Sequence, residues 1–364
     1  MKRQSPFDLE NRLLRIFSQI DPPRDEIGHL LTEEIDWDYI FQTAEDHRVI
    51  PLIFDRFRTL KSDRIPEDVF GRFQNRFREI AGYNFARTTQ LIKLIEPLQK
   101  GGFPVLAYKG MALAALAYGE VTLRQFTDID LLVRKRDFPA IKELLAGIDC
   151  RPVWDLSAKQ EKAFLKYYYE YPFFYGDANT LVEVHWDFVE SFFTFDFDTE
   201  PLWDRVSTVR LYGREIPTLS PADYLIVLCS HASKHFWGRL SWICDIDRLI
   251  VNTRIDWDEA ERLASETGSF RMLLLGAYLS REILRTTLPA AIEKDIAADK
   301  KIAPLGDKFV RGLFASGKAP PRWQEMARTH LKMREKLTTK IKYSQRLFTT
   351  KLIDKLFMPM GRPR

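Results

Sequence analysis

The chain has 364 residues, of which 45% are hydrophobic and 29% charged, and its formal net charge is +4. This composition is typical of a globular protein with two or three cores, and so small a charge does not by itself indicate a nucleic-acid partner. Three widely spaced cysteines without a CxxC pair argue against a disulfide framework or a zinc ribbon. No apolar leader and no apolar stretch of about 18 residues is present, so we expect a cytoplasmic protein without a transmembrane segment.

Residues 1–100 are predicted to be helical. Leu9, Leu13 and Phe17 recur at helical spacing, as do apolar residues between 91 and 98. Asp36 before Trp37 is typical of a helix start, and prolines near residues 22, 51 and 66 predict breaks.

The pattern changes at residue 101. We predict strands at 103–108 and 128–133, helices at 111–118 and 137–146, and hairpins at 171–186 and 206–219. Ser220 followed by Pro221 is typical of an N-cap, and the chain then becomes helical again. The sequence therefore predicts an α+β fold. A small mixed-sheet core at residues 101–219 is flanked by a helical region at 1–100 and another at 220–364.

Two aspartates occupy alternate positions of the second predicted strand. Asp128 and Asp130 point to the same face, about 6–7 Å apart, and repel each other unless a cation lies between them. Mg²⁺ is the usual cation at an oxygen-rich site that handles phosphates. The alternative is a strand end whose carboxylates are paired with Arg124 and Arg134.

A third acid and a possible phosphate turn accompany this pair. Glu183 shares a strand face with His185 and is flanked by valines, so it needs a partner or a metal unless the face is simply exposed. Lys109-Gly110 lies at a strand-to-helix turn that offers N–H groups to a phosphate, although many such turns bind nothing. The P-loop spacing is absent.

His231 and His235 are spaced i, i+4, and Arg239 follows four residues later, with Lys234 nearby. On one continuous helix these residues form a face that would bind a triphosphate or an acceptor. Ala232 excludes the HExxH zinc motif. The alternative is a packing face satisfied by Asp245 or Asp247. Trp237 and Trp242 are expected in the core, as is most of the aromatic cluster at 167–175.

Residues 332–364 contain ten lysines and arginines against two acids. An amphipathic pattern over residues 347–357 predicts a helix that packs against the body with its lysines in solvent. The alternative is a weak contact with an anionic membrane surface or nucleic acid.

Several segments together resemble a known family. They are residues 105–110, Tyr118-Gly119, Arg124, residues 128–133, residues 182–186 and residues 231–245. In this order they resemble the uncharacterised bacterial nucleotidyltransferase family. It belongs to the polymerase-beta-like nucleotidyltransferase superfamily and is similar to abortive-infection-type nucleotidyltransferases. The resemblance implies an ATP-binding or other NTP-binding enzyme that uses Mg²⁺, with Mn²⁺ as the alternative. It would transfer a nucleoside monophosphate to a hydroxyl or phosphate acceptor and release pyrophosphate.

The resemblance also implies roles for individual residues. Asp128 and Asp130 stand at the metal aspartates, and Glu183 stands at the third acid, which binds metal and favours deprotonation of the acceptor. Gly110 and Met111 stand at the phosphate turn, assisted by Lys109. The remaining nucleotide-binding candidates are Arg124, His231, Lys234, His235 and Arg239.

Two alternatives remain open. Met111 replaces a small residue of the superfamily's phosphate turn, and the interval to Asp128 is longer than usual, which motivates a non-catalytic nucleotide-binding or assembly protein. The basic tail motivates a toxin-like enzyme that acts on RNA. The acceptor is expected to be a small molecule, a protein or RNA.

Overall fold

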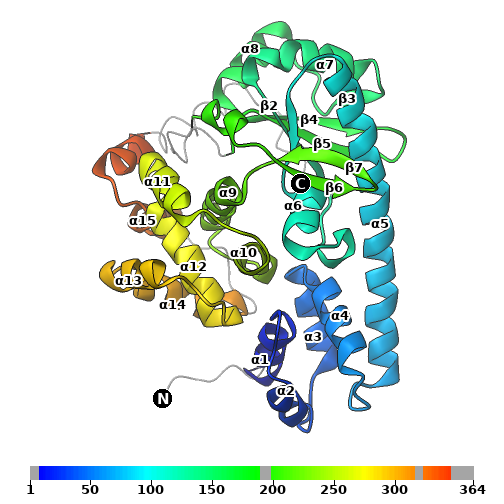
Figure 1. The fold of residues 1–364 in the computed structure, drawn as a ribbon, viewed down its shortest axis with the longest axis vertical. Helices are drawn as coiled ribbons and strands as arrows, with labels where there is room; N and C mark the ends of the chain where they lie inside the picture. The colour runs from blue at the N-terminus through cyan, green and yellow to red at the C-terminus, as the bar shows by residue number, and fades with distance from the viewer. Residues whose placement is uncertain (1–7, 189–197, 316–322, 346–364) are drawn as a thin grey trace.

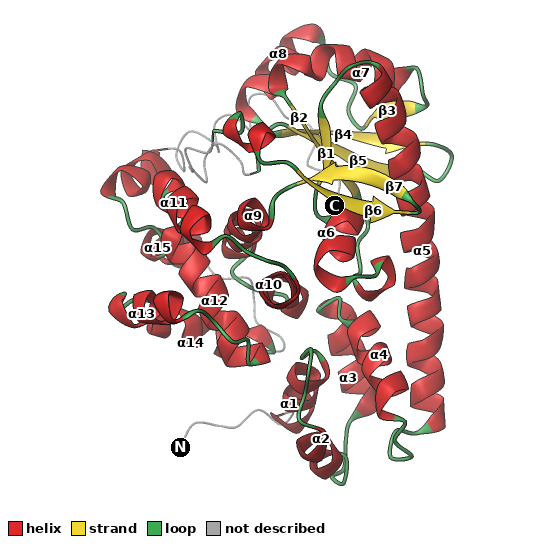
Figure 2. Ribbon diagram, viewed as in Figure 1, coloured by secondary structure: helices red, strands yellow, loops and turns green. Residues whose placement is uncertain are grey.

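The computed structural model of the chain describes residues 8–188, 198–315 and 323–345. The sheet lies at one end of the molecule and helices make up the rest (Figure 1 and Figure 2). The α+β class predicted from the sequence is therefore confirmed. The amphipathic stretch at 347–357 lies outside the described residues.

The N-terminal region is helical, as predicted. The helices are α1 (Asp8–Phe17), α2 (Arg24–Leu30), α3 (Trp37–Asp46), α4 (Ile50–Leu60) and α5 (Glu67–Lys100). The Asp36 side chain accepts a hydrogen bond of 2.8 Å from the Tyr39 N–H, so it caps α3 as expected. Helix α5 runs along one side of the molecule from the α3–α4 pair to the sheet (Figure 1).

The described residues contain one five-stranded mixed sheet in the order β1-β2-β5-β4-β3. Strand β2 pairs with β5 in parallel, and the other neighbours are antiparallel. The parallel register places Asp130 opposite Glu183. The strands are β1 (Val105–Ala107), β2 (Ile129–Val133), β3 (Cys150–Pro152), β4 (Glu170–Tyr175) and β5 (Thr180–His185); β6 (Ser207–Leu211) and β7 (Arg214–Thr218) form a separate hairpin.

The elements between the strands follow the predictions with two additions. Helix α6 (Gly110–Leu113) continues as a π-helical turn at Ala114–Tyr118, and α7 (Phe138–Ala146) follows β2. Strand β3 and helix α8 (Ala158–Tyr167) were missed. Helix α8 buries only Phe164, so its apolar periodicity is weak, although Ser157 and Gln160 form a capping box at its start.

Two hydrophobic clusters form the core. One lies around the sheet and includes the last turns of α5 together with Phe138 of α7, Tyr171 and Phe173. The other joins the N-terminal helices to the C-terminal helices. The aromatic residues of β4 therefore contribute to the core, as expected. The division at residues 100 and 219 stays a prediction.

The C-terminal region begins with the predicted cap: Ser220 Oγ accepts a hydrogen bond of 3.1 Å from the Asp223 N–H. Helix α12 is buried along most of its length and contacts α9, α10 and α14. Within the described ranges, every helix is too short or too polar to cross a bilayer. The helices are α9 (Pro221–Lys234), α10 (Leu240–Asn252), α11 (Trp257–Thr267), α12 (Phe270–Leu284), α13 (Ala290–Ala298), α14 (Ile302–Leu313) and α15 (Trp323–Lys332).

The packing of α12 predicts a large effect of one added methyl group. In Gly276→Ala the new Cβ collides with Cys229 Sγ and lies 3.1 Å from the Trp237 ring. We expect the free energy of unfolding to fall by about 1–3 kcal/mol in denaturant titrations. Gly82→Ala, at an exposed position of α5 with open space around it, should raise it by about 0.5–1 kcal/mol. Equal effects of the two changes would contradict this packing.

Candidate active site

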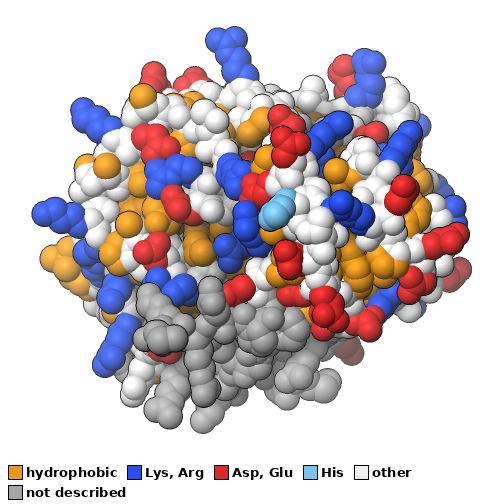
Figure 3. Space-filling model, turned by 90° about the horizontal axis from the view of Figure 1, so that it is seen from below, with side chains coloured by type: hydrophobic (Ala, Val, Ile, Leu, Met, Phe, Trp, Pro, Cys, Tyr) orange, Lys and Arg blue, Asp and Glu red, His pale blue; other side chains and the backbone are white. Residues whose placement is uncertain are grey.

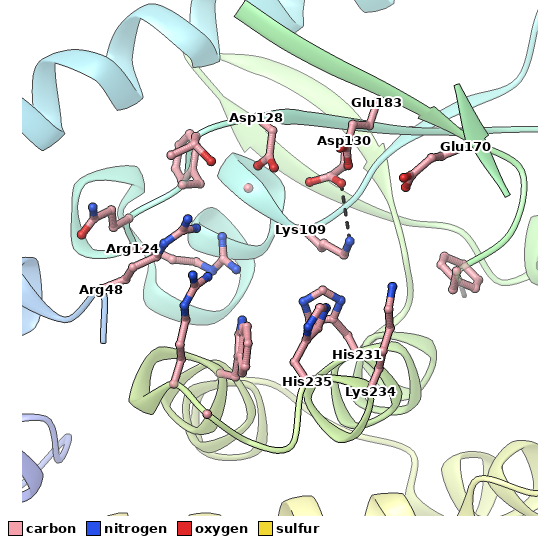
Figure 4. A pocket seen from close by; sticks show the side chains of 18 of the residues that line it. Arg48, Lys109, Arg124, Asp128, Asp130, Glu170, Glu183, His231, Lys234 and His235 are labelled. Atoms are coloured by element: carbon pink, nitrogen blue, oxygen red, sulfur yellow. Dashed lines mark hydrogen bonds and ion pairs between the residues drawn. The ribbon is translucent and has the colours of Figure 1, made fainter. Parts of the chain in front are cut away.

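A cavity of about 500 Å³ lies between the sheet and the helical regions. Acidic side chains from the strands line one wall, and basic side chains from the helices and turns line the other (Figure 4). The lining residues are Arg48, Lys109, Gly110, Arg124, Gln125, Phe126, Thr127, Asp128, Asp130, Tyr169, Glu170, Glu183, Phe188, His231, Lys234, His235, Gly238, Arg239 and Trp242. Ten of the eleven site residues predicted from the sequence are in this set; Met111 is not.

The acidic wall depends on the pairing of β2 with β5. Asp130 is 3% exposed, and its Oδ1 lies 3.5 Å from Lys109 Nζ and 3.1 Å from His185 Nε2. The same His185 nitrogen lies 3.4 Å from Glu183 Oε2. One ligand atom from each of Asp130, Glu183 and His185 lies within 4.8 Å of the others, so the strands converge on a position that suits a cation.

Asp128 lies just before β2 on the same wall. Burial, followed by the charges of Asp130 and Glu183, raises the pKa of Asp128 to about 6. Burial also acts to raise the pKa of Asp130, but Lys109 and His185 outweigh it and hold that pKa below its ordinary value. The nearby cations therefore compensate Asp130 better than Asp128.

Glu170 also lines the acidic wall, and His185 contacts the carboxylates of that wall; neither residue was predicted to belong to the site. Glu170 pairs with His185 across β4 and β5, and its Oε2 lies 3.4 Å from His185 Nδ1. Burial lowers the pKa of His185, but Asp130, Glu183 and Glu170 together raise it to about 9. The three carboxylates thus favour the imidazolium form of His185, and in that form the ring reduces the repulsion among them. The sequence pattern that could have identified His185 as a site residue is its position on the same strand face as Glu183.

The Lys109-Gly110 turn is built from two residues with left-handed backbone. Lys109 has φ 53° and Gly110 has φ 39°. A positive φ is sterically unfavourable for lysine, which has a Cβ atom, but not for glycine. A Cβ on Gly110 would lie 3.6 Å from the Asp128 carbonyl oxygen, so the turn packs directly against the acidic strand. Met111 is 1% exposed in the sheet core. Met111 is therefore a core residue and is not among the residues that line the cavity.

Arg124 and Arg134 are paired with other acids and not with the two aspartates. Arg124 donates two hydrogen bonds to Asp245, of 2.8 and 2.9 Å, and the Tyr118 hydroxyl donates a third, of 2.6 Å. Arg134 pairs with Glu200 at 3.0 Å. The interpretation of Asp128 and Asp130 as a strand end paired with these arginines is therefore wrong. Arg124 still lines the cavity, held in place by a buried carboxylate.

The expected helical stripe of His231, His235 and Arg239 is interrupted. Helix α9 ends at Lys234, because Phe236 and Trp237 adopt left-handed φ values of 57° and 56° that turn the chain. Arg239 instead reaches the cavity from the position that precedes α10.

Other contacts of this wall also differ from expectation. Trp237 is buried as predicted, whereas Trp242 is partly exposed and lies against the His235 ring at 5.3 Å. Asp245 is engaged by Arg124, and Asp247 accepts from Thr286 and Arg248. These aspartates therefore do not satisfy the histidines as the packing interpretation required.

The buried Arg124–Asp245 pair predicts a strong stability effect. Asp245→Asn leaves the guanidinium without its counter-ion, so we expect the free energy of unfolding to fall by about 3–5 kcal/mol in chemical denaturation. In the matched control Glu200→Gln, which affects the more exposed pair with Arg134, the change should stay below about 1 kcal/mol. A small effect of Asp245→Asn would show that the pair does not hold Arg124.

Solved structures similar to the chain have low sequence identity to it. The antibiotic-resistance factor ANT(2'')-Ia is 14% identical, with a TM-score of 0.36 over 58% of this chain and 98% of its own. Lincomycin-bound LnuA, a lincosamide antibiotic adenylyltransferase, is 13% identical, with a TM-score of 0.33 over 45% and 97%. An antigenic nucleotidyltransferase-like protein from Paracoccidioides brasiliensis is 15% identical, with a TM-score of 0.34 over 56% and 94%.

Sequence comparison gives a family. No curated protein matches the chain. A family model described as uncharacterised nucleotidyltransferase matches residues 33–285, which is more than half of the chain. This match includes both walls of the cavity and confirms the family indicated by the motifs. The chain belongs to the family of uncharacterised nucleotidyltransferases.

Proposed function

We propose that this nucleotidyltransferase moves a nucleoside monophosphate from an NTP to a hydroxyl or phosphate acceptor with the help of Mg²⁺, or alternatively Mn²⁺. In this reaction a bond forms between the acceptor oxygen and the α-phosphorus. The bond from that phosphorus to the β-phosphate oxygen breaks, and pyrophosphate leaves with the electron pair. The observation that supports the proposal is the cavity itself, in which Asp128, Asp130 and Glu183 face a basic wall.

The acidic wall has the chemistry of a divalent-cation site. Asp128, Asp130 and Glu183 offer carboxylate oxygens, the donors that Mg²⁺ prefers. Burial, and after it the charges of Asp130 and Glu183, raises the pKa of Asp128 to about 6, and a bound divalent cation would favour its ionised form. A divalent cation held there would neutralise developing charge on the phosphates and favour ionisation of an acceptor hydroxyl. His185 Nε2 lies beside both Asp130 and Glu183 and would orient them, and in its neutral form the ring would offer the third ligand atom of this group.

The two walls suit different parts of a metal-bound nucleotide. Lys109 and the backbone of Gly110 would bind donor phosphates beside Asp128, while Arg124 would present a guanidinium fixed by Asp245. Glu183 would assist deprotonation of the attacking group. His231, Lys234 and His235 would contact the nucleotide or the acceptor from α9 and its end.

The acceptor class stays open among a small molecule, a protein and RNA. On the face seen in Figure 3, the described lysines and arginines are interspersed with aspartates and glutamates. Incubation of the pure protein with each α-labelled NTP, Mg²⁺ and a cell extract would identify the labelled acceptor. A separate incubation with tRNA tests the RNA alternative.

The reaction proposal predicts a strong dependence on the acidic wall. In the labelling assay, Asp128→Asn and Asp130→Asn should each reduce transfer by about 10²–10³-fold, because each removes a charge that holds the cation. Asp177→Asn, an exposed residue in the β4–β5 turn, is the matched control and should transfer label like the wild type. Transfer that is unchanged in both cavity variants would contradict the proposal.

The alternative is a non-catalytic nucleotide-binding protein. It would be favoured if the wild type transfers no label and binds nucleotide equally well with and without Mg²⁺. Isothermal titration of Mg²⁺ and of each NTP into the wild type and Asp130→Asn makes this distinction.

A further inference from the structure

Arg48 lies in the turn that ends α3, where its backbone is left-handed. Its φ is 56°. Its N–H donates to the Glu45 carbonyl oxygen at 3.0 Å, and the next N–H, of Val49, donates to the Ala44 carbonyl oxygen at 2.9 Å. This is the Schellman pattern of a helix end, in which glycine is the favoured residue at the position of Arg48. Arginine therefore does not stabilise the backbone conformation at this position. We attribute the presence of arginine there to the contacts of its side chain.

His47 connects this turn to the start of α10. Its Nδ1 accepts a hydrogen bond of 3.0 Å from the Leu240 N–H, and its carbonyl oxygen accepts one of 3.2 Å from the Ser241 N–H. Burial lowers the pKa of His47 to about 4, so the ring is neutral and able to accept. Because Arg239 immediately precedes Leu240, these two bonds hold the Arg48 turn next to the Arg239 turn.

Both guanidinium groups face the cavity and are partly buried. Among the residues that the structure describes, neither makes an ion pair like that of Arg124 with Asp245, and the charge of Asp128 acts on Arg48 without direct pairing. Burial lowers the pKa of Arg239, and the charge of Arg48 lowers it further, so the two groups repel each other. Arginine nevertheless stays protonated in proteins. Two partly buried like charges are stabilised when an anion lies between them.

The position of Arg48 and Arg239 in the cavity indicates which kind of anion they bind. Arg48 and Arg124 lie on the side of Asp128, and Glu170 and Lys234 lie toward the other side (Figure 4). Asp128 also contacts the Gly110 turn. Arg239 lies close enough to Arg48 for the two charges to interact. This end of the cavity therefore combines a candidate metal ligand, a phosphate turn and two guanidiniums that make no ion pair with a described residue, which is the chemistry that recognises an oligophosphate.

We propose that Arg48 and Arg239, held together by His47, form a subsite for the terminal phosphates of the nucleotide donor. The inference rests on the proposed function for the identity of the donor. It assigns the N-terminal helical region a direct role in substrate binding, because Arg48 contacts the ligand from outside the sheet domain. His47 is a positioning residue.

The test uses inorganic triphosphate, with EDTA present so that metal binding does not contribute. Isothermal titration into Arg48→Gln and Arg239→Gln should give a Kd at least about tenfold higher than in the wild type. Arg254→Gln removes the same charge at an exposed position outside this cavity, and its Kd should stay within about twofold. Absence of triphosphate binding by the wild type, or unchanged binding by both cavity variants, would overturn the proposal.

A second variant separates a ligand-binding role from a structural one. Arg48→Gly suits the left-handed backbone, so the proposal predicts a higher Tm together with weakened triphosphate binding. A lower Tm with unchanged triphosphate binding would show that Arg48 serves the fold instead.

Competition identifies the source of the phosphates. Triphosphate should displace a labelled NTP from the wild type. If triphosphate binding depends on Arg48 but triphosphate displaces none of the four NTPs, the assignment of the subsite to the nucleotide donor would be overturned. If displacement occurs but no NTP gives label transfer, the subsite stands and the transferase reaction of the proposed function fails.

Discussion

The parallel pairing of β2 with β5 is the constraint on which the cavity depends. It places Asp130 opposite Glu183, with Asp128 two residues earlier on the same wall and Glu170 on the next strand. Carboxylates brought together away from water repel strongly, so the surrounding structure must supply positive charge. Lys109 and His185 supply part of it from the sheet domain. Burial, and after it the charges of Asp130 and Glu183, still raises the pKa of Asp128 to about 6.

The helical regions supply the opposite wall, and their shared packing fixes its geometry. One hydrophobic cluster joins helices from both ends of the chain, and His47 connects the ends of α3 and α10 at a separation of 193 residues. Arg124 is fixed separately by Asp245 of α10. The basic wall is thus a consequence of tertiary packing, and disruption of the helical cluster would affect the cavity without changing any acidic residue.

Local pattern predicted much of the fold and of the acidic wall. Alternation along residues 128–133 and 181–186 predicted which acids share a face, and capping residues such as Asp36 and Ser220 marked helix starts. Glu170 was missed because its place beside His185 depends on the β4–β5 register, which is not visible in one strand. Arg48 was missed because its place beside Arg239 depends on the hydrogen bonds from Leu240 and Ser241 to His47, which join segments far apart in the sequence. Arg239 reaches the cavity through a turn, whereas a continuous helix had been expected.

The central claim is that Asp128, Asp130 and Glu183 hold a divalent cation that faces donor phosphates on the basic wall. A crystal structure with Mn²⁺ and an NTP analogue that resists cleavage at the α-phosphate tests it most directly, because anomalous scattering locates the metal. The account predicts Mn²⁺ within about 2.0–2.3 Å of carboxylate oxygens of Asp128 and Asp130 and bound to the analogue's phosphates. Mn²⁺ located elsewhere, or an analogue bound away from this cavity, would contradict it.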